Sequence, residues 1–287
     1  WTNVFGCCGY KIPLERYQEV YGDDYTQHEY DQDIKMWGGN CFGMAVTAAL
    51  FYKNKLPVAD YTHDVGVLAA GGYDDMVTLN GRTYLRLKKN SELTKLIERY
   101  QIWEKSNDFL EATKKSISKY ETKTDAEMFS DIVNEIKNKK EPFVVLIDWD
   151  ETNSLHIAHA LVVDSSRTPK NLKDNWVRIY LYDPNNPYFE YFGEKKPGSS
   201  YTQAENRFLD VNISNGQWKM AAQENASGTS TTEIGYDSGG NKLRNSKLLI
   251  VNANDYPTNF NKKATYYRSN ENTIDIAYAS DNFEIYN

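Results

Sequence analysis

The sequence predicts a single α+β domain, mainly helical over residues 1–140 and mainly β over residues 141–287. Apolar residues recur at helical spacing through the middle of the chain, and β-branched and aromatic runs separated by polar loops follow Pro142. No internal repeat or linker divides the 287 residues. That length suits one large domain or two closely packed parts, and hydrophobic residues make up 40% of it, enough for a sizeable core.

The first predicted helix begins at Cys41. Residues 1–37 are polar, aromatic and acidic, and we expect them to form loops with short ordered pieces. Gly38-Gly39-Asn40 is a turn signal, and the run 41–51 is apolar on nearly all sides. The pattern predicts a buried helix. Glycine is unfavourable inside a helix, so Gly43 indicates that something approaches this helix closely.

A hairpin and three amphipathic helices are expected next. Asn80-Gly81 joins two strand-like runs, which predicts the hairpin. Helical spacing of apolar residues predicts helices that contain residues 93–100, 109–117 and 129–136. Thr124 and Glu127 have the spacing of a capping box, so we expect the third of these helices to begin there.

The β part is predicted as one sheet with a second hairpin at Asn215-Gly216. The strands are expected at residues 143–147, 157–163, 177–182, 209–213, 218–220, 248–251, 274–278 and 283–285. Residues 223–246 are polar, and we expect a loop there.

Charge and composition exclude several partners. The 33 basic and 40 acidic residues give a net charge of −7, which repels phosphate backbones, and no basic patch is apparent, so we expect no nucleic-acid partner. No apolar run approaches the ~20 residues that span a bilayer, so we expect no membrane span. The polar, Asn-, Tyr- and Ser-rich composition with few cysteines favours a secreted or cell-surface bacterial protein. Because no signal segment precedes Trp1, we expect a mature chain without its targeting region. The sequence gives no indication of oligomeric state.

Cys41 is the candidate nucleophile among three cysteines. Cys7 and Cys8 are adjacent, so a disulfide between them would be strained and a shared metal site geometrically poor. At a helix N-terminus the unpaired N–H groups and the dipole stabilise a thiolate, the attacking form of cysteine. Two glycines before Cys41 let the backbone approach a substrate. The alternative is a buried, inert cysteine in an apolar helix.

His159 and Asp183 are candidate partners of this thiol. Alanines flank His159 within an apolar strand and leave room around its ring, as a general base requires; the alternative is a satisfied core histidine. His156 is three residues away, an odd step that places it on the other strand face and argues against a His156/His159 metal pair. Asp183 ends the next strand. If the two strands are antiparallel neighbours, Asp183 can orient His159; the alternative is a simple Asp-Pro-Asn turn.

The order of these motifs resembles the papain-like cysteine peptidase superfamily, particularly its bacterial branches. The motifs are residues 39–45 (Gly-Asn-Cys-Phe-Gly-Met-Ala), residues 159–163 (His-Ala-Leu-Val-Val) and residues 182–185 (Tyr-Asp-Pro-Asn). The resemblance implies a helical lobe carrying the Cys helix packed on an antiparallel β-sheet lobe. It also implies Cys41 as nucleophile, His159 as base and then acid, and Asp183 as orienter.

The resemblance departs from the family at the oxyanion hole. The family places a Gln a few residues before the Cys, six in papain itself, and Lys35 occupies that position here. Gln32 is our preferred oxyanion donor, reaching into a groove between the Cys helix and the sheet edge, and Asn40 is the alternative. The Cys41 backbone N–H is expected to supply a second donor. Trp37 and Phe42 are expected to wall the groove, with simple packing an equal alternative for Phe42.

The sequence carries no other catalytic or metal-binding signature, so we expect no cofactor and no metal. The acidic runs at residues 22–24 and 148–151 match no EF-hand loop and are interpreted as solvated turns. The resulting hypothesis is a thiol hydrolase, most simply a secreted cysteine peptidase that acts on a peptide or protein substrate. The alternatives are a transglutaminase- or deamidase-like acyl transferase and a non-catalytic papain-like binding module at the cell surface.

Overall fold

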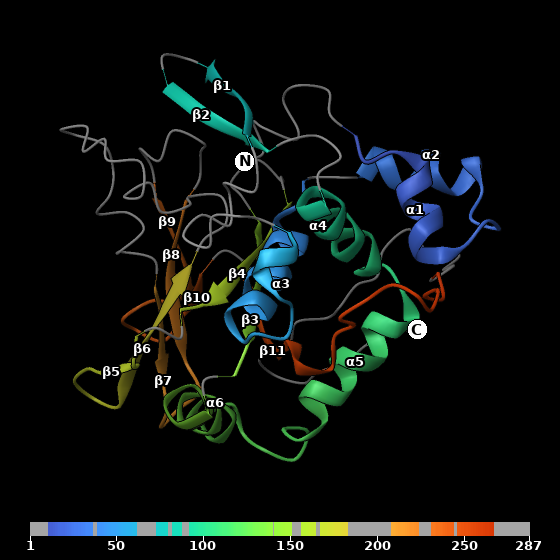
Figure 1. The fold of residues 1–287 in the computed structure, drawn as a ribbon. Coiled ribbons are helices and arrows are strands. Elements are labelled where there is room, and N and C mark those ends of the chain that lie inside the picture. Colours follow the sequence, from blue (N-terminus) through green and yellow to red (C-terminus); the bar gives the residue numbers. More distant parts are fainter. Residues whose placement is uncertain are drawn as a thin grey trace.

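The protein is a mixed structure of helices and antiparallel sheet (Figure 1). The computed structural model describes residues 11–36, 39–61, 73–79, 82–87, 92–139, 141–150, 156–164, 167–182, 208–223, 231–243 and 246–266. Among these residues every α-helix ends by Lys139, and every strand except one hairpin lies after residue 142. The predicted α+β class is therefore confirmed.

Six α-helices occur in the described residues. They are α1 (Leu14–Tyr21), α2 (Gln27–Met36), α3 (Cys41–Tyr52), α4 (Glu92–Trp103), α5 (Asn107–Ser118) and α6 (Asp125–Lys139). Short 3₁₀ turns are present at Val58–Asp60 (η2) and Ala253–Asp255 (η4). Each helix expected from residue 41 onward is confirmed, and α6 begins with the predicted capping box, in which Thr124 and Glu127 bond each other's backbone N–H groups.

The strands form a hairpin and one large sheet. The hairpin pairs β1 (Tyr73–Leu79) with β2 (Arg82–Leu87) in antiparallel register and confirms the predicted pairing of these two runs. The large sheet contains β3 (Phe143–Asp150), β4 (His156–Val163), β5 (Lys170–Asn171), β6 (Trp176–Tyr182), β7 (Phe208–Asn212), β8 (Trp218–Gln223), β9 (Thr231–Tyr236), β10 (Lys242–Leu243) and β11 (Lys247–Asn252). Its order is β10-β9-β8-β7-β6-β4-β3-β11, with β5 paired to β6. All pairings are antiparallel.

The two faces of the sheet bury two separate cores, because successive strand residues point to opposite faces. The α3-side core contains alternate residues of β3, β4 and β11 packed with helices α1, α3, α4 and α5. From the sheet it includes Val144, Leu146, Ala160, Val162, Leu249 and Val251. The α6-side core contains the intervening residues packed with α6. Those residues include Val145, Ile147, Leu161, Val163, Leu248 and Ile250.

Helix α3 lies between the sheet and α4, as its uniform apolar sequence predicts (Figure 1). The ten residues from Phe42 to Phe51 are all buried. A Cβ atom built on Gly43 would lie 2.0 Å from the carbonyl oxygen of Ile97, so only glycine permits this approach of α3 to α4. The neighbour that Gly43 predicts is therefore helix α4.

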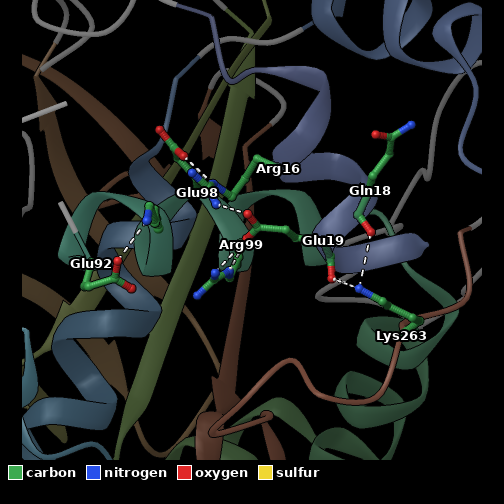
Figure 2. Close-up of polar contacts among 8 residues, drawn as sticks. Arg16, Gln18, Glu19, Glu92, Glu98, Arg99 and Lys263 are labelled. Carbon is green, nitrogen blue, oxygen red and sulfur yellow. Dashed lines mark hydrogen bonds and ion pairs between the residues drawn. The ribbon is translucent and has the colours of Figure 1, made fainter. Parts of the chain in front are cut away.

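Ion pairs join α1 to α4 on the outer side of the helical half (Figure 2). The Arg16 guanidinium donates to Glu98 at 2.8 Å, and both side chains are almost fully buried. Glu19 accepts from Arg99 and Arg16, and its carbonyl oxygen accepts from the Lys263 ammonium at 2.8 Å. These contacts fix α1 on α4 and the segment near Lys263 on α1.

Three sequence interpretations are wrong. Residues 11–36 hold helices α1 and α2, whose buried faces consist largely of Tyr17, Tyr21 and other amphipathic side chains that periodicity does not separate from loop. Strands β9 and β10 lie within the predicted loop 223–246. Asp148, interpreted as part of a solvated turn, lies in β3 and is only 4% exposed.

Some predictions fall outside the described residues. They are the strands at residues 274–278 and 283–285, the cysteines Cys7 and Cys8, and Trp37. No helix in the described part of the chain has both the length and the apolar character needed to cross a bilayer.

Candidate active site

Cys41 is the first residue of α3 and a free thiol. Its side chain is partly exposed, whereas the ten residues after it are buried. The N–H groups of the first helical turn have no partner within the helix, and they and the dipole create positive potential around this residue. A thiol at this position is both reachable and next to the backbone N–H groups of the first helical turn.

Asn40, the residue before Cys41, is buried without a hydrogen bond. Its side chain is 3% exposed, and neither Nδ2 nor Oδ1 has a hydrogen-bond partner. Asn at an N-cap ordinarily accepts from a backbone N–H of the first turn, but the Asn40 side chain makes no such bond. A buried amide with both functions unused is unfavourable and uncommon.

Gln101 of α4 supplies the missing cap. Its Oε1 accepts from the Gly43 N–H at 3.1 Å, and its Nε2 donates to Glu104 at 2.7 Å. Burial raises the pKa of Glu104 to about 7, against the opposing effects of the Lys105 charge and the Gln101 hydrogen bond. A polar chain therefore runs from the first turn of α3 to a carboxyl group that titrates near neutrality.

Gly39 leaves space beside this helix end. Its φ is +147°, a conformation that favours glycine, and no described atom lies within 4 Å of the position that a Cβ would take. Among the described residues, nothing therefore blocks the approach predicted from the glycines before Cys41 at the position of Gly39.

His159 lies on β4, the strand against which α3 packs. In the register of β3 and β4, His159 opposes Ile147, which belongs to the α6-side core. Ala160 and Val162, whose side chains lie on the other face of β4 from His159, belong to the α3-side core. Cys41 packs against that same core. The His159 side chain therefore points to the sheet face opposite α3.

The backbone of β4 separates the two histidines as the sequence predicts. Asp150 pairs with His156 and Ile147 with His159 in an uninterrupted register, so the two positions lie on opposite faces. The position of His156 has the parity of Ala160, the residue that packs toward α3.

Cys41 lies toward the end of the sheet where β4 begins. Just beyond the other end of α3, the Lys53 ammonium donates to the Lys139 carbonyl, and the Lys55 ammonium donates to the Asn254 carbonyl. Those carbonyls lie near the start of β3 and the end of β11, where β4 ends. A 12-residue helix is ~18 Å long, comparable to β4, and Figure 1 shows α3 beside that strand.

Asp183 lies outside the described residues. The predicted role of Asp183 requires β4 and β6 to be antiparallel neighbours. They are, since Val162 opposes Tyr182, the residue before Asp183.

Gln32, the preferred oxyanion donor, is exposed on α2, and so is Lys35. Phe42 is 1% exposed and packs edge-on against Phe109, with 5.2 Å between the ring centroids. This contact agrees with the alternative in which Phe42 only packs in the core.

Sequence reasoning missed Gln101, although a signal was present. Leu93, Ile97 and Tyr100 define the buried face of α4, and Gln101 is four residues after Ile97, on the same face. A polar side chain in that position requires a partner. The partner, the Gly43 N–H, comes from a helix 58 residues away in sequence.

Comparison with known proteins adds no assignment: no protein-family model, curated protein or solved structure matches the chain. No group of three or more His, Cys, Asp or Glu side chains that could hold a metal ion occurs within the described ranges.

Proposed function

We propose that the chain is a thiol hydrolase of papain-like fold in which Cys41 is the nucleophile. The observation that carries the proposal is the partly exposed Cys41 thiol at the first position of a buried 12-residue helix. The unpaired Asn40 amide and the space beside Gly39 lie next to it in the chain. The order of a Cys helix, a His strand and an antiparallel neighbour that ends before Asp183 supports the same proposal.

The chemistry proposed is hydrolysis of an amide through a thioester. The Cys41 thiolate attacks the carbonyl carbon, and the carbonyl electron pair moves to the oxygen. As the tetrahedral intermediate collapses, the C–N bond breaks and the protonated histidine gives its proton to the departing amine. The histidine then takes a proton from water, which attacks the thioester; the acid leaves and the thiolate is restored. The sum is amide plus water giving acid plus amine.

The identity of the base is the open step of this proposal. His159 is the residue that the family resemblance implies, with Asp183 to orient it. Its side chain lies on the α6-side face, whereas position 156 has the parity of the α3-side face. The two histidines therefore form a matched pair for mutation.

The test is release of soluble fragments from fluorescein-labelled casein. Wild type is expected to hydrolyse it, Cys41→Ala to be inactive with an unchanged melting temperature, and a Cys7→Ala/Cys8→Ala variant to stay active. Loss of activity in His159→Ala alone would assign the base to the implied triad, and loss in His156→Ala alone would assign it to the α3-side face. Activity that survives Cys41→Ala would refute the proposal.

Two alternatives are separated by further measurements. Adding a primary amine distinguishes an acyl transferase, because the amine rather than water then takes the acyl group. The orientation of His159 away from α3 favours the second alternative, a non-catalytic binding module. A Cys41 thiol that stays unlabelled by iodoacetamide in the folded protein, together with no hydrolysis, would support that module.

A further inference from the structure

The start of α3 presents a donor and an acceptor that no residue in the described part of the chain pairs with. Nδ2 of Asn40 carries two N–H groups and Oδ1 carries two lone pairs, and both atoms are buried without a partner. Buried polar groups in folded proteins are almost always paired, so an unpaired pair next to a partly exposed thiol indicates a missing ligand.

Asn40 is unpaired because Gln101 occupies the N–H group that the Asn40 side chain would otherwise bind. The N–H that an N-cap side chain would bind belongs to Gly43, three residues later, and Gln101 already accepts it at 3.1 Å. Gln101 in turn is held by Glu104 through its Nε2. Helix α4 therefore takes over the capping function and leaves the Asn40 amide available.

We infer that the Asn40 side chain binds a carbonyl oxygen and a neighbouring N–H of an amide substrate, with Nδ2 donating to the oxygen and Oδ1 accepting from the N–H. This inference rests on the proposed function and deepens it by naming the substrate class. An amide offers one acceptor and one donor, as the free Asn40 side chain requires. An ester or a carboxylate offers acceptors only and would leave Oδ1 unpaired. The substrate is therefore a primary carboxamide or an extended peptide. In the peptide the C=O and N–H that pair with Asn40 belong to one residue, because those of a single trans peptide bond point to opposite sides.

This assignment gives each group a part in the reaction. When the Cys41 sulfur attacks, the carbonyl oxygen becomes negatively charged and the hydrogen bond from Nδ2 strengthens. Oδ1 accepts from the N–H of a primary carboxamide or, in a peptide, from the N–H of the residue whose carbonyl is attacked. Asn40 replaces Gln32 as the oxyanion donor, since Gln32 is exposed on α2 whereas Asn40 adjoins the nucleophile. Gln101 is a positioning residue, because it acts only by occupying the Gly43 N–H.

The test compares two alkylating reagents of similar size. Iodoacetamide carries a primary amide and iodoacetate a carboxylate, so only the first satisfies both atoms of Asn40. The rate of modification of Cys41 by each reagent is measured by mass spectrometry of its peptide. Cys7 and Cys8, followed in the same samples, provide an internal reference. The measured quantity is the ratio of the iodoacetamide rate to the iodoacetate rate in each variant. Comparing this ratio between variants cancels the repulsion of iodoacetate by the net charge of −7, which all variants share.

Asn40→Ala and Asn40→Leu are the test variants, and Leu retains most of the volume. Both are expected to lower the iodoacetamide-to-iodoacetate ratio at Cys41 about fivefold to tenfold, the size of a lost hydrogen bond between neutral groups. The matched control is Asn215→Ala, which removes an exposed amide from the β7–β8 hairpin and should leave the ratio unchanged. Melting temperatures confirm that each variant is folded.

The outcomes separate this inference from the proposed function. An unchanged ratio in folded Asn40 variants would overturn the inference even if casein is hydrolysed. A lowered ratio without casein hydrolysis would retain amide recognition and refute the hydrolase. If hydrolysis occurs, Asn40→Leu should reduce its rate about 10² to 10³-fold, as expected for loss of an oxyanion donor. A comparable loss in Gln32→Ala, with Asn40→Leu active, would assign the oxyanion role to Gln32 instead.

Discussion

The starts of α3 and α5 differ in how completely their hydrogen bonds are satisfied. Ser106 caps α5: its Oγ accepts from the Phe109 N–H at 3.0 Å and donates to the Trp103 carbonyl at 2.7 Å. Asn40 occupies the same position before α3, and its side chain bonds nothing. Both residues are buried, so solvent does not explain the difference. The first turn of α5 is capped by the side chain of its own N-cap residue, whereas the first turn of α3 is capped by Gln101 of α4.

The cap from Gln101 explains why the start of α3 is a better candidate site than the starts of α2 and α6. On the surface, α2 and α6 begin with capping boxes formed by Thr26 with Glu29 and Thr124 with Glu127. Those ends need no ligand, because their own side chains satisfy the first turn. The four predictions below test the contrast, beginning with the contact that brings α4 close enough to act as a cap.

Gly43→Ala is expected to have the largest effect. The added Cβ would lie 2.0 Å from the Ile97 carbonyl oxygen, so α3 and α4 must move apart and the Gln101 cap must lengthen. Overpacking of this kind usually costs about 1–3 kcal/mol, and we expect a loss near the upper end in the free energy of unfolding. Denaturation in urea measures it. Gly239→Ala is the control: in this exposed turn the added Cβ would meet only the side-chain ends of Asn241 and Asp237, at 3.2 and 3.3 Å, so the cost should stay below about 1 kcal/mol. Equal stability of both variants would contradict the close approach of the two helices.

Glu104→Gln is expected to change the pH dependence of stability. Burial raises the pKa of Glu104 from 4.5 to about 7, so its carboxyl binds a proton more tightly in the folded state. The stabilisation from this group is complete below pH 4.5 and is lost as the pH rises through 7. Glutamine does not ionise, so the variant should gain on the order of 2 kcal/mol relative to wild type between pH 5 and pH 9. Urea denaturation at both pH values measures the difference, and parallel pH profiles would show that Glu104 is not buried as described.

Ser106→Ala and Asn40→Ala compare the two caps directly. Ser106→Ala removes a buried cap and should lower the free energy of unfolding by about 1–2 kcal/mol. Asn40→Ala removes no hydrogen bond, so stability should stay within about 0.5 kcal/mol of wild type or increase. Thermal denaturation of the two variants under one condition is the measurement. A loss in Asn40→Ala as large as that in Ser106→Ala would mean that the Asn40 side chain already has a partner.

The elements that could be predicted from the sequence are those whose buried positions are occupied by aliphatic residues. The apolar run after Cys41 fixes a buried helix, and Thr124 with Glu127 marks the start of α6. The pattern fails in α1, where Tyr17 and Tyr21 form the buried face. Tyrosine is amphipathic, so its spacing alone does not distinguish a core position from a surface one.

The position of Cys41 could be predicted because it depends on local sequence, whereas its surroundings depend on tertiary packing. Strand β4 is apolar on both faces, so alternation separates His156 from His159 but does not say which face meets α3. The cap from Gln101 depends on the approach of α4 to Gly43, which no local pattern encodes. For the same reason the buried, unpaired state of Asn40 appears only in the folded chain.

Thr124→Ala is expected to have the smallest effect, and it tests the self-sufficient kind of helix start. The Thr124 hydroxyl accepts from the Glu127 N–H at 3.3 Å, and the Glu127 carboxylate accepts from the Thr124 N–H at 2.8 Å. Both groups are exposed, so water replaces the lost bond and the cost should be about 0.5–1 kcal/mol, the lower end for a cap. The Thr124 N–H and the Thr124 hydroxyl both donate to the Glu127 carboxylate, and these two bonds hold the pKa of Glu127 below its ordinary value; Thr124→Ala removes the second of them. The stabilisation is therefore present above pH 4.5 and is lost as the pH falls below it, so wild type and Thr124→Ala should converge in stability in acid. Thermal denaturation at pH 7 and pH 3 measures the convergence. A constant difference at both pH values would show that Thr124 acts through the geometry of the turn and not through the carboxylate of Glu127.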